Sequence, residues 1–154
     1  MPASKITILY VDDEENNLFS FKATFRMKYE VLTAISGDEA LEILAAKQVH
    51  IIVTDQRMPE MTGVEFLEKV VLKFHDPIRI MLTGYADMSA VVDAVNKGKI
   101  FHYITKPWNE EDLEATIERA YAKYLEKAHL KEMNEKLEGS NDQLEFLLRQ
   151  QMLS

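Results

Sequence analysis

The chain has 154 residues, of which 47% are hydrophobic and 29% are charged, a composition typical of one globular domain with a short extension. Its 18 basic and 26 acidic residues give a net charge of −8, which disfavours direct binding to nucleic acid or to an anionic membrane. The absence of cysteine excludes disulfides and thiol catalysis, and neither a leader peptide nor an apolar run of about 20 residues is found, so we expect a cytoplasmic protein.

Short apolar, β-branched runs alternate with helical periodicity over the first 124 residues. The runs predict five strands, at residues 6–11, 31–34, 51–54, 78–82 and 101–105. Between and after them, apolar residues recur every three or four positions, which predicts five helices. The strands are almost continuously apolar, as expected for a parallel sheet covered on both faces. The pattern predicts an α/β fold, in which a doubly wound five-stranded parallel sheet is flanked by five helices.

Three of the predicted helices begin at recognisable capping residues. Ser36 precedes Glu39 and Thr62 precedes Glu65 with the spacing of a capping box. Asn109 is followed by three acidic residues, which the helix dipole favours in a first turn. We therefore expect each helix to start directly after its capping residue.

From about residue 125 the chain becomes rich in Glu, Lys, Gln and Leu and carries no strand signal. A heptad seam with polar members follows, at Leu130, Met133, Leu137, Ser140, Leu144, Leu147 and Gln151. We therefore expect a domain at residues 1–124 and a helical coiled-coil linker or extension at residues 125–154. Gly139 either breaks this segment into two helices or lies within a single one.

Three interpretations of residues 125–154 stay open at this point. The segment is a solvated helix, a coil that pairs with a second copy in a homodimer, or a signalling linker. Because the chain ends within its heptad pattern, we expect that a C-terminal output domain is missing, although a stand-alone protein also fits.

Polar side chains follow four of the five predicted strands. Asp12 and Asp13 follow the first strand, Asp55 the third, Thr83 the fourth and Lys106 the fifth. Because the carboxyl ends of parallel strands meet at one edge of a sheet, we expect these side chains to converge. Taken alone, each has a plainer interpretation as a helix cap, a turn residue or a surface charge. Their combination favours a functional site.

The charges of this cluster indicate its chemistry. Three carboxylates repel one another unless a cation lies between them, and Mg²⁺ suits a site with oxygen ligands and several waters. Lys106 adds a second positive charge, and the hydroxyl of Thr83 can donate to an anion. Such a site favours phosphoryl transfer to a carboxylate, which would form an aspartyl phosphate.

Four motifs surround these residues: ILYVDDE at 8–14, VTDQRMPEMTG at 53–63, MLTGY at 81–85 and YITKPW at 103–108. Together they resemble the response-regulator receiver domain of two-component signalling, over about residues 5–124. The resemblance implies a flavodoxin-like fold. The residues in these motifs are similar to those of receivers fused to phosphohydrolase domains or to transcriptional activators.

The resemblance implies a role for each residue of the cluster. Asp55 is expected to be the phosphoacceptor and a metal ligand. Asp13 is expected to bind Mg²⁺ directly, Asp12 largely through water, and Arg57 through its backbone carbonyl. Lys106 is expected to pair with the phosphoryl oxygens.

The resemblance also implies a switch. Phosphorylation is expected to draw the hydroxyl of Thr83 toward the phosphoryl group and to let Tyr103 move inward. These movements would change the surface formed by the fourth helix, the fifth strand and the fifth helix. The peptide bond before Pro107 is expected to be cis.

Two further positions are expected to tune the lifetime of the phosphate. Arg57 and Tyr85 each lie two residues beyond a site residue, Asp55 and Thr83 respectively. Both side chains are large enough to hinder an attacking water, which predicts a moderately long-lived phosphate. The connection at residues 98–102 departs from the family pattern, since it is one residue longer.

The leading interpretation is a two-component response regulator that a partner sensor histidine kinase phosphorylates, with Mg²⁺ as the cofactor. We expect no enzyme activity beyond its own phosphorylation and slow dephosphorylation. Two alternatives stay open: a phosphorylation-independent dimerisation scaffold, and a phosphatase with an aspartyl-phosphate intermediate. The phosphatase is disfavoured because such enzymes need an acid two residues after the nucleophile, where Arg57 cannot give up a proton.

Overall fold

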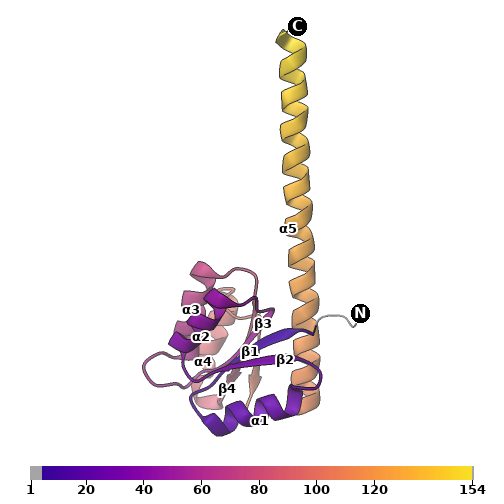
Figure 1. The fold of residues 1–154 in the computed structure, drawn as a ribbon. Helices are drawn as coiled ribbons and strands as arrows, with labels where there is room; N and C mark the ends of the chain where they lie inside the picture. The colour runs from indigo at the N-terminus through magenta and orange to yellow at the C-terminus, as the bar shows by residue number, and fades with distance from the viewer. Residues whose placement is uncertain (1–4, 154) are drawn as a thin grey trace. The chain divides into compact units, whose positions relative to one another are not determined.

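The computed structural model describes residues 5–153, which contain one five-stranded sheet with the strand order β2-β1-β3-β4-β5 (Figure 1). All neighbouring strands are parallel. The strands are β1 (Thr7–Val11), β2 (Glu30–Ala34), β3 (Ile51–Asp55), β4 (Ile78–Thr83) and β5 (His102–Thr105). The five predicted strands are confirmed, and each differs from its prediction by one residue at one end.

Five helices connect and follow the strands. They are α1 (Glu15–Phe25), α2 (Gly37–Ala46), α3 (Gly63–Lys73), α4 (Met88–Asn96) and α5 (Glu110–Leu153), and a short 3-10 turn, η1 (Tyr85–Asp87), leads into α4. The predicted capping residues are confirmed, because each accepts a hydrogen bond from the backbone N–H three residues later. The distances are 3.1 Å from Glu39 to Ser36, 3.2 Å from Glu65 to Thr62 and 3.1 Å from Asp112 to Asn109.

The helices cover both faces of the sheet, as β1 shows. Ile8 and Tyr10 join a buried cluster with residues of α1 and α5, whereas Leu9 and Val11 join a second cluster with residues of α2, α3 and α4. Every residue of β1 and β3 is buried, which explains why these strands are so continuously apolar. The predicted doubly wound α/β fold is confirmed, and it brings the carboxyl ends of β1, β3, β4 and β5 to one edge.

The chain divides into two compact units, Met1–Tyr124 and Leu125–Ser154. Helix α5 is a single helix that passes through Gly139 without a break. All side chains from Leu125 to Met152 are exposed, including those of the heptad seam. No helix within residues 5–153 combines the length and the apolar character that crossing a membrane requires.

Candidate functional site

Three carboxylates meet where β1 and β3 end. One oxygen from each of Asp12, Asp13 and Asp55 lies within 4.8 Å of the others. The residues Asp12 and Asp55 are buried, with exposed fractions of 0% and 6%, and Asp13 is half-buried. The convergence follows from the parallel pairing of β1 with β3, which places the residues after β1 beside the last residue of β3.

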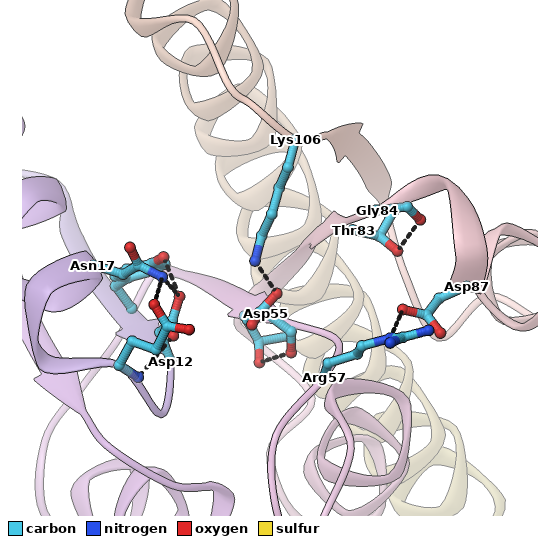
Figure 2. A network of polar contacts seen from close by, with 11 residues as sticks. Asp12, Asn17, Asp55, Arg57, Thr83, Gly84, Asp87 and Lys106 are labelled. Carbon is cyan, nitrogen blue, oxygen red and sulfur yellow. Dashed lines mark hydrogen bonds and ion pairs between the residues drawn. The ribbon is translucent and has the colours of Figure 1, made fainter.

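Asp12 is held in place by three hydrogen bonds. Its Oδ2 atom accepts from the hydroxyl of Tyr10 at 2.8 Å, and its Oδ1 atom accepts from the N–H of Glu14 at 3.0 Å. Oδ2 also accepts from Nδ2 of Asn17 at 3.1 Å (Figure 2). Burial and the negative charge of Asp12 raise the pKa of Tyr10 well above its ordinary value, so that the hydroxyl stays a donor. Since both oxygens of Asp12 already accept hydrogen bonds, this carboxylate suits contact with a metal through water.

The sequence interpretation did not include Tyr10 and Asn17. One signal was present for Tyr10, because residues two apart in a strand point to the same face, and Tyr10 precedes Asp12 by two positions. The ring of Tyr10 also stacks on Phe21 of α1 with 4.1 Å between the ring centroids. Asn17 lies on α1, and only the folded turn between β1 and α1 brings it back to Asp12.

Lys106 reaches Asp55 from the end of β5. Its Nζ atom lies 2.5 Å from Oδ1 of Asp55, and Figure 2 shows the lysine side chain extending toward the carboxylate. Burial raises the pKa of Asp55 above its ordinary value, although the hydrogen bond and the charge of Lys106 act in the opposite direction. The backbone N–H of Lys106 donates to the carbonyl of Thr83 at 2.9 Å, and the peptide bond between Lys106 and Pro107 is cis.

The other predicted site residues lie around this cluster. Thr83 is buried at the end of β4, and its hydroxyl donates to the carbonyl of Gly84 at 3.1 Å. Tyr103 is half-buried and packs against the cluster that contains residues of α4. Tyr85 is 78% exposed, and its backbone carbonyl accepts a hydrogen bond from the N–H of Met88.

The side chain of Arg57 pairs with a residue outside the carboxylate cluster. The guanidinium Nε atom lies 2.9 Å from Oδ2 of Asp87, at the end of η1. The arginine side chain is 73% exposed, whereas that of Asp87 is 21% exposed. The structure therefore places the Arg57 side chain in an ion pair and not beside Asp55.

The loop after β3 is held by contacts that the sequence interpretation did not include. The hydroxyl of Thr54 donates to the carbonyl of Asp55 at 3.0 Å, and the side-chain carbonyl of Gln56 accepts from the N–H of Val64 at 2.9 Å. Gly63 begins α3, and a Cβ atom there would overlap the carbonyl oxygen of Asp55. Only glycine allows α3 to start this close to the end of β3.

The carboxylate cluster fits a hard divalent cation. Mg²⁺ binds oxygen ligands at about 2.0–2.1 Å, so that oxygens on opposite sides of the ion lie about 4 Å apart. The three carboxylate oxygens lie at most 4.8 Å apart, so that the carboxylates need to move only slightly toward one another to bind one ion. Asp13 contributes an oxygen to this cluster and is half-buried, so that its carboxylate can reach an ion directly.

The comparison with known families decides the class of protein. The family model of the response regulator receiver domain matches residues 8–118. The chain belongs to the response regulator receiver family. Receivers of this family bind Mg²⁺ at an acidic pocket and are phosphorylated by histidine kinases. The predicted resemblance is thus confirmed at the level of the family.

The receiver is similar to parts of longer transcriptional regulators. It is 38% identical over 120 residues to the hydrogenase transcriptional regulatory protein HoxA of Cupriavidus necator, which covers 78% of this chain and 25% of that protein. It is 30% identical over 137 residues to the regulatory protein AtoC of Escherichia coli, which covers 86% of this chain and 29% of that protein. The receiver therefore spans a quarter to a third of the length of these relatives.

Solved structures agree with the predicted fold. A structure described as an adenylate cyclase from Rhodopirellula baltica matches with a TM-score of 0.83 and 32% identity, over 86% of this chain and 98% of that chain. A response regulator receiver domain protein (CheY-like) from Methanospirillum hungatei matches with a TM-score of 0.75 and 31% identity, over 80% of this chain and 99% of that chain. The flavodoxin-like receiver fold is confirmed.

Proposed function

We propose that Asp55 accepts a phosphoryl group from the phosphohistidine of a partner sensor histidine kinase. The observation that carries this proposal is a buried carboxylate with an ammonium group 2.5 Å away and two further carboxylates within 4.8 Å. An oxygen of Asp55 attacks the phosphorus atom. A P–O bond forms, the P–N bond of the donor breaks, and the histidine nitrogen leaves with the electron pair.

The neighbouring residues are proposed to support this transfer. Asp13 and Asp55 would hold Mg²⁺ directly, Asp12 through water, and Arg57 through its backbone carbonyl. When bound, Mg²⁺ neutralises the charge that develops on the phosphoryl oxygens. Lys106 turns from the bare carboxylate to a phosphoryl oxygen, which keeps a positive charge beside the modified side chain.

Phosphorylation is proposed to act on the α4–β5–α5 surface through two side chains. The hydroxyl of Thr83, which donates to Gly84 in this structure, would turn to a phosphoryl oxygen. Tyr103, which is half-buried, would then move further inward. Arg57 and Tyr85 are proposed to slow hydrolysis, for which Arg57 would have to turn from its ion pair with Asp87 toward the phosphoryl group. The electrostatic change at Asp55 would thus become a change in packing at the surface.

Residues 125–154 are proposed to form a coiled-coil linker that pairs with a second copy and leads to an output domain. The leucines of the seam support the pairing, because they are 53–61% exposed on a continuous helix. The relatives support an output domain, because HoxA and AtoC are regulatory proteins of which this receiver spans only a part.

Mass spectrometry of the intact chain tests the phosphoacceptor. After incubation with Mg²⁺ and acetyl phosphate, we expect the native chain to gain one phosphoryl group and Asp55→Asn to gain none. Chelation of Mg²⁺ should abolish the gain. Asp76→Asn is the matched control, because Asp76 is an exposed carboxylate just before β4, at the opposite edge of the sheet, and should be phosphorylated normally. Folded native protein that gains no phosphoryl group, or equal gain in Asp55→Asn, would refute the assignment.

A further inference from the structure

An ion pair joins the loop at residues 56–62, which follows Asp55 and is called the acceptor loop below, to the start of α4. Arg57, two residues after Asp55, places its Nε atom 2.9 Å from Oδ2 of Asp87 (Figure 2). Asp87 is the last residue of η1, the turn that connects β4 with α4. The pair therefore links the loop that carries the acceptor to the segment that follows Thr83.

The same segment holds the hydroxyl of Thr83. The carbonyl oxygen of Gly84 accepts two hydrogen bonds, one from Oγ1 of Thr83 at 3.1 Å and one from the N–H of Asp87 at 3.3 Å. The backbone of Thr83 is fixed independently, because its carbonyl accepts from the N–H of Lys106 at 2.9 Å. A connected set of contacts thus runs from Arg57 through Asp87 and Gly84 to the side chain of Thr83.

We propose that Arg57 and Asp87 are positioning residues that hold the β4–α4 connection in the conformation in which Thr83 bonds to Gly84. This inference rests on the proposed phosphorylation of Asp55. To donate to a phosphoryl group, the hydroxyl of Thr83 must leave the carbonyl of Gly84, and residues 84–87 then lose one of the bonds that order them.

The ion pair opposes that change, because it ties Asp87 to the acceptor loop in the conformation in which the carbonyl of Gly84 accepts from both Thr83 and Asp87. A contact that is made in one of two conformations shifts the balance toward that conformation by its own free energy. Arg57–Asp87 therefore lowers the fraction of receivers that are ready to bind a phosphoryl group. Its loss should favour the activated conformation without phosphorylation.

The size of the effect follows from the exposure of the pair. With Arg57 73% exposed, water and salt screen the interaction, and ion pairs of this kind shift equilibria by about two- to fivefold. A second pair provides a matched control. Lys97 lies 2.9 Å from Asp93, both side chains are exposed, and both residues lie at the C-terminal end of α4. This pair has no connection to the acceptor loop or to Thr83.

The test measures the affinity of the full chain for beryllium fluoride in the presence of Mg²⁺, by calorimetric titration. Beryllium fluoride mimics a phosphoryl group on a carboxylate and requires no phosphodonor. We expect Asp87→Asn and Arg57→Gln each to bind it about two- to fivefold more tightly than the native chain. The double variant should bind no more tightly than either single variant, and Asp93→Asn should match the native chain.

Two further readouts separate positioning from a merely structural role. The exchanged pair, Arg57→Asp with Asp87→Arg, should return the affinity toward the native value, because it restores the ion pair with its charges reversed. Thermal unfolding should change little in either single variant, since the Arg57 side chain is 73% exposed and the ion pair is screened by water.

Three outcomes would overturn the inference. If the native chain binds beryllium fluoride but the single variants bind it equally or more weakly, the positioning role is wrong while the proposed phosphorylation stands. Full additivity of the two substitutions would also contradict it, because the residues would then act separately. If the native chain does not bind beryllium fluoride at all, the proposed phosphorylation and this inference fail together.

Discussion

At the scale of single residues, a buried hydroxyl is one of the three donors that orient Asp12. Tyr10 supplies that hydroxyl, and its ring is locked by stacking on Phe21. The carboxylate of Asp12 therefore faces the metal site in one orientation before any ion binds. Such outer partners of a metal site set its affinity because they hold the ligands in place.

Substitution of Tyr10 by Phe should weaken Mg²⁺ binding without removing any ligand. The ring would still stack on Phe21, but Oδ2 of Asp12 would lose its buried donor and keep only Asn17. We expect the affinity for Mg²⁺ to fall by about tenfold and the free energy of unfolding to fall by about 1 kcal/mol. Calorimetric titration with Mg²⁺ and urea denaturation measure the two effects.

Tyr29→Phe is the matched control for this experiment. The hydroxyl of Tyr29 donates to Glu118 at 2.7 Å, and its ring packs in the same buried cluster as Tyr10. Its loss should lower stability in the same way and leave the affinity for Mg²⁺ unchanged. Equal Mg²⁺ affinities in both variants and the native chain would show that Tyr10 has no part in the metal site.

At the scale of elements, one arginine holds the connection between α4 and β5. Arg79, on β4, donates to three backbone carbonyls. The distances are 2.7 Å to Lys99, 3.1 Å to Pro77 and 3.2 Å to Gly98. The ammonium group of Lys99 pairs with Glu68 of α3 at 2.9 Å. The connection at residues 98–102, which we predict to be one residue longer than the family pattern, is thus held by its own set of contacts.

Arg79→Met should destabilise this part of the α4–β5–α5 surface. The methionine keeps most of the apolar stem, but three carbonyl groups lose a charged donor. We expect the free energy of unfolding to fall by about 2 kcal/mol, measured by urea denaturation. Lys97→Met is the control, because it removes the exposed ion pair with Asp93 at the C-terminal end of α4 and should cost less than about 0.5 kcal/mol. A loss in Arg79→Met that is no larger than in the control would contradict this account.

The elements also show what could be predicted from the sequence. Strands, helix starts and the convergence of strand-end residues follow from local patterns, and Ser36, Thr62 and Asn109 cap their helices as predicted. The Arg57–Asp87 pair could not be predicted in this way, because its residues are 30 positions apart and belong to loops. The same holds for Gly63, whose close approach to the end of β3 depends on how α3 packs.

At the scale of the whole molecule, the continuity of α5 bears on how a signal would leave the receiver. Gly139 costs about 1 kcal/mol relative to alanine within a helix, and α5 nevertheless continues through it between the helix-forming residues of 130–138 and 143–150. A single helix from Glu110 to Leu153 includes residues of the α4–β5–α5 surface and the whole heptad seam. A change at that surface and a change in coil pairing therefore concern the same helix.

The coil should make the chain a weak, concentration-dependent dimer. The seam is only about three heptads long, and Ser140 and Gln151 are polar members that lower its stability. Leu137 and Leu144 occupy equivalent seam positions, and both are largely exposed in the single chain. Replacing both by Lys should abolish association, because it would bury charges in the pair.

Sedimentation equilibrium of the full chain measures this association. Phe146→Lys is the matched control, because Phe146 is as exposed as Leu137, at 61%, but lies off the seam, so that the variant should still dimerise. A native chain that is monomeric at every concentration would refute the coil.

The same measurement with beryllium fluoride and Mg²⁺ then separates a coil that responds to phosphorylation from a phosphorylation-independent scaffold. Tighter association in the presence of beryllium fluoride would link the coil to phosphorylation, whereas association that is equal with and without it, and equal in Asp55→Asn, would favour a phosphorylation-independent scaffold.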